Sequence, residues 1–224
     1  MNITLLGHHF LQLAAEEQGV AVVPIEGMNE NKLRELRTDA AKQEYRPAIS
    51  TTITEVKQNF SCCNEFELGS LWKDVAFTIG AQLMSEYSRT GQSSMIDGPL
   101  FFTDLSLQKY PATDPSVRFG ISPHRDQSAF INLVAILLIS GPSSFCVCSD
   151  KSGRGASDVM ARPGDLILMR GGGYGGGKLS RPYHFVGPIY DPYGRLTFGM
   201  RQLTSDVAEA AKVHSILAHE EPVA

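Results

Sequence analysis

Seven short apolar or alternating runs in the second half of this 224-residue chain most strongly constrain its fold. Each run has the length of a β-strand, and glycine and proline residues separate each run from the next. Many short strands with such turns indicate a β-sandwich or a jelly roll. The runs cover residues 100–110, 119–124, 129–139, 144–148, 165–169, 184–189 and 195–202.

The first 90 residues have a mainly helical pattern with one early strand. Apolar residues at helical spacing predict helices over 5–19, 32–44 and 69–89, and the run VAVVPI over 20–25 predicts the strand. Either Asn29 or Asn31 is a suitable N-cap for the second helix. The polar segment 46–65 is predicted to be a long surface loop. The third helix has an apolar stripe that we expect to pack against a sheet, made of Leu71, Trp72, Val75, Ile79, Leu83 and Tyr87.

These patterns predict one domain that is mainly β with flanking helices. We expect helical support over residues 1–90, a jelly-roll core over 91–204 and a C-terminal helix over 205–224. The length suits one sizeable hydrophobic core, and no internal repeat or linker interrupts the chain.

The composition is that of a soluble globular protein, with 42% hydrophobic and 20% charged residues. A formal net charge of −4 argues against a domain that grips a nucleic-acid backbone, although a local basic patch can sit on an acidic protein. The N-terminal segment lacks the features of a signal peptide, and no stretch reaches the roughly 20 apolar residues of a membrane span. We therefore expect a cytoplasmic protein without a membrane partner. Four cysteines, which we expect to be buried reduced thiols, are Cys62, Cys63, Cys146 and Cys148.

A candidate metal site begins with the pair His124 and Asp126. On an extended strand, residues two apart project to the same face, so one imidazole and one carboxylate can bind a single cation. His184, at the start of another predicted strand, is the candidate third ligand. Two imidazoles and one carboxylate on one face form the facial triad that suits iron(II) and leaves open positions on the metal.

A candidate anion site follows 11 residues after His184. Arg195 and Thr197 are two apart and face the same side of a predicted strand. A guanidinium binds a carboxylate through two parallel hydrogen bonds, and a neighbouring hydroxyl can add a third. The alternative is a surface arginine on an edge strand.

Taken together, the pattern His-X-Asp, then His, then Arg-X-Thr resembles the iron(II)/2-oxoglutarate-dependent dioxygenase superfamily. The resemblance covers roughly residues 100–202 and implies a double-stranded β-helix, with iron(II), 2-oxoglutarate and O2 as cofactor and cosubstrates. It implies hydroxylation of a C–H bond coupled to decarboxylation of 2-oxoglutarate to succinate. It assigns the metal to His124, Asp126 and His184, and the cosubstrate's distal carboxylate to Arg195 with Thr197.

Some details are similar to the AlkB group of demethylases. Gln108-Lys109-Tyr110 lies where that group has an Asn-X-Tyr pair that contacts the cosubstrate, and Arg195 and Arg201 are spaced like its paired arginines. The resemblance adds Gln108, Tyr110 and Arg201 to the cosubstrate site and leaves open which of the two arginines binds the distal carboxylate. Gln108 departs from the group's asparagine.

We expect the substrate to be a small molecule, such as an amino acid or a biosynthetic intermediate. The alternatives are an AlkB-like demethylase of nucleic acid or protein, and a non-catalytic cupin-like metal-binding module. Arg118, Arg125, Gln127 and Arg181 flank the ligands and are candidates for substrate contact or for surface salt bridges. The glycine-rich segment 171–177 is predicted to be a flexible loop at the mouth of the site, with Tyr174 as an exposed residue or a lid.

Overall fold

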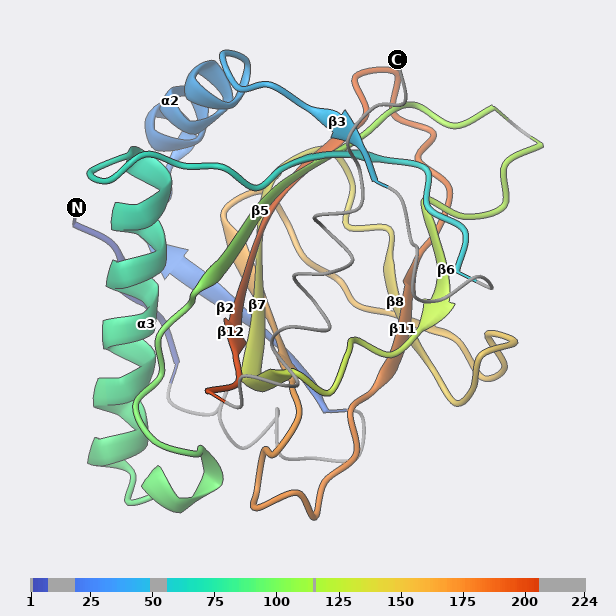
Figure 1. Ribbon diagram of the computed structural model, residues 1–224. Helices are drawn as coiled ribbons and strands as arrows, with labels where there is room; N and C mark the ends of the chain where they lie inside the picture. Colours follow the sequence, from blue (N-terminus) through green and yellow to red (C-terminus); the bar gives the residue numbers. More distant parts are fainter. Residues whose placement is uncertain (1, 8–18, 49–55, 115, 206–224) are drawn as a thin grey trace, which may run out of the picture.

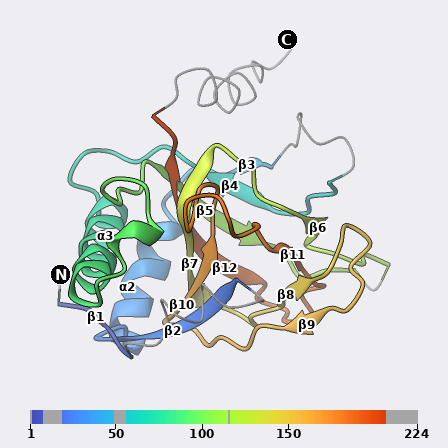
Figure 2. The same ribbon diagram turned by 90° about the horizontal axis from the view of Figure 1, so that it is seen from below.

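Two antiparallel β-sheets face each other, and two helices cover the outer side of the larger sheet (Figures 1 and 2). The helices are α2 (Glu30–Ala40) and α3 (Leu71–Arg89). The computed structural model describes residues 2–7, 19–48, 56–114 and 116–205. Its mainly β architecture with flanking helices confirms the predicted jelly roll.

The larger sheet has eight strands and contains the long central strands of the fold. Its order is β1-β2-β10-β7-β12-β5-β4-β3, and every pairing is antiparallel. The strands are β1 (Thr4–Leu5), β2 (Val20–Glu26), β10 (Asp165–Arg170), β7 (Phe130–Ser140), β12 (Arg195–Leu203), β5 (Asp104–Tyr110), β4 (Ser61–Cys63) and β3 (Arg46–Pro47).

The smaller sheet has four short strands in the order β6-β11-β8-β9. They are β6 (Ile121–His124), β11 (Tyr183–Val186), β8 (Phe145–Cys148) and β9 (Ser157–Asp158). All seven predicted strands of the second half are present, with ends that differ by a few residues. A short 3-10 helix, η1 (Ser93–Met95), follows α3.

Strand β7 is apolar from residue 133 to residue 139 because both of its faces are buried there. Leu133, Ala135 and Leu137 face the helices, whereas Val134 and Ile136 face the space between the sheets. A strand with one solvated face would alternate between apolar and polar residues, so a continuous apolar run is typical of a central strand covered on both sides. This packing produces two hydrophobic layers, one under the helices and one between the sheets.

Helix α3 packs on the larger sheet as its apolar stripe predicts. Trp72, Val75 and Ile79 are fully buried in the layer beneath the helices. Ser70 caps the helix through its hydroxyl, which accepts a hydrogen bond from the Lys73 amide. The Trp72 indole nitrogen donates to Asp39 of α2 at 2.6 Å, which ties the two helices together.

Helix α2 begins after Asn29, one of the two predicted caps, whose side chain accepts from the Lys32 amide at 3.1 Å. It ends at Ala40, four residues earlier than predicted. Most of the predicted helix over 5–19 lies outside the described residues, although Leu5 belongs to strand β1. The predicted C-terminal helix over 205–224 also lies outside them, except for residue 205.

Two expectations about the first 90 residues are wrong in part. The segment 46–65 is not only loop, because it contributes strands β3 and β4, and β4 pairs with β5. Residues before 90 are not only helical support, because β2 pairs with β10 inside the larger sheet. Strands β3 and β4 are two and three residues long, and β4 pairs with a strand far away in the sequence, so local pattern does not reveal them. The apolar run over 20–25 did predict β2, but it did not predict the pairing of β2 with β10.

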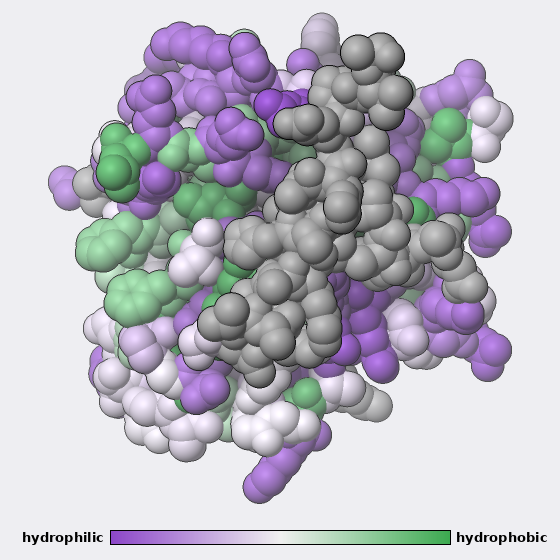
Figure 3. All heavy atoms as spheres, viewed as in Figure 1, coloured by the Kyte–Doolittle hydropathy of each residue, from purple (hydrophilic) through white to green (hydrophobic). Residues whose placement is uncertain are grey.

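All four cysteines are free thiols; Cys63 and Cys146 are buried and the other two are half-buried. Among the helices in the described ranges, none combines the length and apolar character needed to cross a bilayer. On the face shown in Figure 3, hydrophobic side chains gather over α3, where Phe77 is exposed, and hydrophilic side chains predominate on the side of β6.

Candidate metal and cosubstrate site

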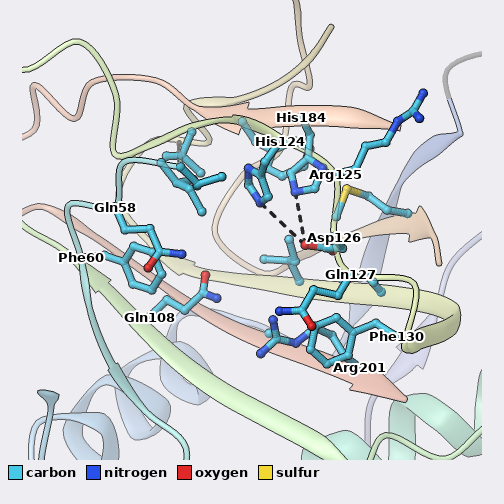
Figure 4. Close-up of a pocket in the computed structure, with 18 of the residues that line it drawn as sticks. Gln58, Phe60, Gln108, His124, Arg125, Asp126, Gln127, Phe130, His184 and Arg201 are labelled. Carbon is cyan, nitrogen blue, oxygen red and sulfur yellow. Dashed lines mark ion pairs between the residues drawn. The ribbon is translucent and has the colours of Figure 1, made fainter. Parts of the chain in front are cut away.

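The two histidines of the candidate triad are direct neighbours in the smaller sheet. His124 at the end of β6 is paired in register with His184 at the start of β11, and Asp126 follows β6 by two residues. The Nε2 atoms of His124 and His184 lie 3.7 Å and 3.8 Å from one carboxylate oxygen of Asp126. Figure 4 shows the three side chains converging on one point. Their donor atoms all lie within 4.8 Å of one another, a spacing that one metal ion can bridge.

Backbone carbonyls hold both imidazoles in this orientation. Nδ1 of His124 lies 2.8 Å from the Ser122 carbonyl oxygen, and Nδ1 of His184 lies 3.3 Å from that of Pro182. A proton on each Nδ1 donates to the carbonyl and leaves Nε2 as a free lone pair for a metal. The Phe145 ring stacks on His184 with ring centroids 5.4 Å apart, which fixes the plane of that ring.

Burial and the neighbouring charges favour the protonation states that a metal needs. Burial and the nearby His184 lower the pKa of His124 to about 4, so its imidazole is neutral at pH 7. Burial alone would raise the pKa of Asp126, but His184, His124 and Arg201 together lower it below its ordinary value. A neutral imidazole beside an ionised carboxylate is a ready ligand set.

Of the residues that flank the ligands, Arg181 supports Asp126 rather than facing a substrate. Its guanidinium donates a hydrogen bond to the Asp126 backbone carbonyl. Gln127 lines the cavity beside the triad. Arg125 is exposed, lies 4.1 Å from the centre of the Tyr183 ring, and points away from the triad in Figure 4.

Arg195 lies in the same cavity as the triad and is almost completely buried, with 2% of its surface exposed. Its Nε and Nη2 atoms have no hydrogen-bond partner among the described residues. The guanidinium lies 4.9 Å from the centre of the Tyr110 ring, and burial lowers the pKa of Arg195. A buried cation without a carboxylate partner is costly, so an anion bound here would offset that cost.

Gln108, Tyr110 and Thr197 lie next to Arg195 because β5 and β12 pair in register. Arg195 is opposite Tyr110, and Thr197 is opposite Gln108. The Tyr110 hydroxyl donates to the Gln108 side-chain oxygen at 3.1 Å, and the Thr197 hydroxyl donates to the same oxygen at 3.4 Å. Gln108 and Tyr110 line the cavity, whereas Thr197 is fully buried behind Gln108.

Arg201 also lines the cavity, but its charge is already neutralised. Its guanidinium binds Asp104 through Nη2 at 2.5 Å and Nε at 2.6 Å. It also lies 4.3 Å from the centre of the Phe130 ring. The two arginines that sequence reasoning left as alternatives therefore differ, because Arg201 has a carboxylate partner and Arg195 has none among the described residues.

The cavity that contains these groups has a volume of about 140 Å³. A polar cavity of this size has room for a small ligand. In Figure 4 the triad lies on one side of the cavity and Arg201 on another; Arg195 and apolar side chains from β7 and β10 also line the cavity. The apolar side chains are Val134, Ile136 and Met169.

Sequence reasoning missed three residues of this site: Gln58, Phe60 and Asp104. Phe60 stacks on Tyr110 with ring centroids 4.8 Å apart, and the Gln58 side-chain oxygen is buried without a hydrogen-bond partner among the described residues. Both come from the segment predicted as surface loop. Asp104 is brought to Arg201 by the register of β5 and β12, which no local signal reveals.

Tyr174 is neither an exposed residue nor a lid. It is fully buried, and its hydroxyl lies 3.0 Å from that of Tyr87 on α3. Gly172 approaches Ser128 so closely that a Cβ there would lie 2.3 Å from the Ser128 carbonyl oxygen. Residues 171–177 do not line the metal cavity, so the prediction of a loop at its mouth is wrong. Gly171 and Gly172 allow the start of this segment to pack closely against the backbone of residues 128–131.

No protein-family model matches the sequence, and no curated protein matches it in sequence. Solved structures with the same fold have low sequence identity. A 2OG-Fe(II) oxygenase family oxidoreductase from Burkholderia pseudomallei superposes with a TM-score of 0.58 at 9% identity, covering 88% of this chain and 89% of that one. A prolyl-4-hydroxylase from Pseudomonas putida has a TM-score of 0.59 at 15% identity, covering 88% and 98%. HygX from Streptomyces hygroscopicus, solved with nickel, 2-oxoglutarate and hygromycin B bound, has a TM-score of 0.54 at 14% identity, covering 90% and 88%. The chain therefore has the fold of the 2OG-Fe(II) oxygenases, as the resemblance in sequence predicted.

Proposed function

We propose that this protein is an iron(II)- and 2-oxoglutarate-dependent dioxygenase that hydroxylates a C–H bond of a small molecule. His124, Asp126 and His184 would hold the iron, and Arg195 would bind the distal carboxylate of 2-oxoglutarate. When bound, iron(II) with 2-oxoglutarate and O2 supplies the oxidising chemistry, in which one oxygen atom enters the substrate and the other enters succinate as CO2 leaves.

The observation that carries the proposal is the buried guanidinium of Arg195 in the cavity of the triad, which has no carboxylate partner and whose Nε and Nη2 atoms have no hydrogen-bond partner among the described residues. A cupin-like metal module has no use for this buried cation, which costs stability as long as it has no anionic partner. A dicarboxylate that chelates the metal at one end gives the guanidinium a partner at the other. The short cavity, with the triad and Arg195 on its walls, favours a ligand of this kind.

The neighbouring residues would prepare the site for the cosubstrate. Gln108 accepts hydrogen bonds from Tyr110 and Thr197, which holds its amide in one orientation beside Arg195. The Tyr110 ring, packed between Phe60 and the guanidinium, keeps Arg195 directed into the cavity. The apolar side chains that line the cavity would exclude water from the ion pair between Arg195 and the carboxylate. Without water, that ion pair is stronger.

The proposal is tested by calorimetric titration of two oxo-acids into the Mn(II)-loaded protein. 2-Oxopentanoate has the length of 2-oxoglutarate but carries a methyl group in place of the distal carboxylate. We expect 2-oxoglutarate to bind more tightly by about 30-fold, because a charge-assisted pair contributes about 2 kcal/mol. In Arg195→Met this preference should disappear, and 2-oxopentanoate should bind as it does to the original protein.

The control variant is Arg89→Met, which removes an exposed arginine on α3 that does not line the cavity. It should retain the full preference for 2-oxoglutarate. Equal binding of the two oxo-acids to the original protein, with metal bound, would disprove the assignment of Arg195. A preference that survives in Arg195→Met would do the same and would direct attention to Arg201.

A further inference from the structure

A second, larger cleft opens directly onto the metal cavity. It has a volume of about 790 Å³ and shares Val56, Gln58, His124 and Arg125 with the cavity of the triad. Clefts of about 300–1,000 Å³ are the usual size of small-molecule sites. Because it adjoins His124, a molecule bound in it reaches the metal position from outside.

The cleft concentrates positive charge on a protein that is acidic overall. Four of the residues that line it are basic: Lys57, Arg118, Arg125 and Lys151. None of the described residues that line it is acidic, although the whole chain has a formal net charge of −4. A cleft lined by one sign of charge raises the local concentration of ligands of the opposite sign.

The two arginines of the cleft are held in place by aromatic rings, and their hydrogen-bond donors stay available. Arg118 lies 5.1 Å from the centre of the Phe119 ring, and Arg125 lies 4.1 Å from that of Tyr183. Neither forms a salt bridge within the described part of the chain. A guanidinium stacked on a ring keeps the N–H groups along its edge available for an anion.

Aromatic side chains lie beside the cleft. A neighbouring hollow of about 470 Å³ shares Arg118 and Phe119 with the cleft and adds Phe185, Pro188 and Tyr190. The rings of Phe119 and Phe185 meet edge to face with centroids 5.4 Å apart. Apolar or aromatic groups of a ligand can therefore be covered beside the basic side chains.

From these observations we infer that the substrate is a small organic anion with an apolar or aromatic portion. The inference rests on the proposed function for the reaction. The binding site is inferred from the residues that line the cleft and does not depend on that reaction. The anionic group, a carboxylate or a phosphate, binds among Lys57, Arg118 and Arg125. Gln58, whose amide points into the cavity in Figure 4, offers the substrate a buried oxygen without a partner among the described residues. A hydroxyl or amine of the substrate donates to it next to the triad.

The cleft favours a small anion over a nucleic acid. A protein that grips a nucleic acid contacts on the order of 6–10 phosphates along an extended basic surface. Here the four cations line one bounded cleft on an acidic chain. Single-stranded DNA therefore serves as the probe for the nucleic-acid alternative.

The test uses matched pairs of small aromatic probes and direct binding by calorimetry. 3-Phenylpropanoate is compared with its neutral amide, 3-phenylpropanamide, and phenyl phosphate is compared with phenol. All titrations are made in the Arg195→Met variant as well as the original protein, so that the buried Arg195 cannot account for anion binding. We expect at least one anion to bind more tightly than its neutral counterpart by about tenfold or more in both proteins. The anion with the larger gain in affinity over its neutral counterpart shows whether the site prefers a carboxylate or a phosphate.

The double variant Lys57→Gln/Arg118→Gln should lose this preference, and Lys42→Gln, an exposed cation at the end of α2, should retain it. The side chains of Lys57 and Arg118 are exposed, so their replacement leaves the core intact. Equal affinity for anions and neutral probes in the original protein would overturn the inference. Tighter binding of single-stranded DNA than of either anion, with a steep loss of affinity as salt rises, would also overturn it.

These titrations need neither oxygen nor turnover, so the two proposals can fail separately. A protein that discriminates the anionic probes but not the two oxo-acids would retain the anion cleft and lose the 2-oxoglutarate assignment. The reverse result would retain the cosubstrate site and disprove the anionic substrate.

Discussion

Arg195 and Tyr110 face each other across the paired strands β12 and β5, with the guanidinium 4.9 Å from the centre of the phenol ring. The pair gives the cavity that contains the candidate metal ligands a fixed positive group. Arg201, six residues along the same strand, is bound by Asp104. One strand therefore carries a buried arginine without a carboxylate partner and a half-buried arginine with one, and their replacement should change the free energy of unfolding in opposite directions.

Arg195→Met should raise the free energy of unfolding of the ligand-free protein by about 1–2 kcal/mol, because it replaces a buried unpaired cation with an apolar side chain of similar length. Arg201→Met should lower it by about 1–3 kcal/mol, because the half-buried carboxylate of Asp104 loses its partner. Urea denaturation of the three proteins measures both changes. A loss of stability in Arg195→Met as large as that in Arg201→Met would show that Arg195 is a structural residue.

Gly194 controls how closely β12 approaches Tyr110. Its φ is +76°, and a Cβ at this position would lie 2.3 Å from the Tyr110 carbonyl oxygen. Gly194→Ala should therefore cost about 2–4 kcal/mol and weaken 2-oxoglutarate binding, because it displaces Arg195. Gly69→Ala is the matched control, since Gly69 has a φ of +77° but open space around it. It should cost only about 1 kcal/mol and leave binding unchanged. Equal losses of stability in the two variants would contradict the close contact.

Tyr174→Phe should lower the free energy of unfolding by about 1 kcal/mol, because it removes the buried hydrogen bond with Tyr87. It should leave the affinity for 2-oxoglutarate unchanged, since Tyr174 does not line the cavity. Tyr193→Phe, at a tyrosine that is 96% exposed, is the control and should change neither quantity. Thermal melts and oxo-acid titrations of both variants provide the measurements. A marked loss of 2-oxoglutarate binding in Tyr174→Phe would restore the lid hypothesis.

Metal binding should stabilise the fold, because the buried carboxylate of Asp126 gains a cationic partner. Mn(II) at 100 times its dissociation constant should add about 2.7 kcal/mol to the free energy of unfolding, and a chelator should reverse the gain. In Asp126→Ala the Mn(II)-dependent rise in melting temperature should be lost. A rise that persists in this variant would place the metal at another site.

The metal ligands could be predicted from the sequence, but the contacts that distinguish the two nearby arginines could not. His124, Asp126 and His184 could be proposed because metal-binding residue types recurred at strand spacing. The pairing of His184 with His124 in one sheet, and of Asp104 with Arg201, depends on strand register. Register follows from tertiary packing, so the sequence could not separate Arg195 from Arg201.

The seven strands of the second half could be predicted because their apolar runs and turns are local signals. Strands β3 and β4 could not, since they are two and three residues long and depend on β5 for their pairing. Tyr174 was misjudged for a related reason. A glycine-rich segment is usually flexible, but here Gly171 and Gly172 pack against the backbone of residues 128–131 and carry the tyrosine into the core.

The central claim is that the triad and Arg195 form one site for iron(II) and 2-oxoglutarate. The most direct test is the visible absorption spectrum of the protein under anaerobic conditions, with iron(II) and 2-oxoglutarate added separately and together. Our account predicts a weak metal-to-ligand charge-transfer band that requires both additions and is absent in His124→Ala. A folded, iron-loaded protein that shows no such band with 2-oxoglutarate would contradict the account and favour a metal-binding module without an oxo-acid.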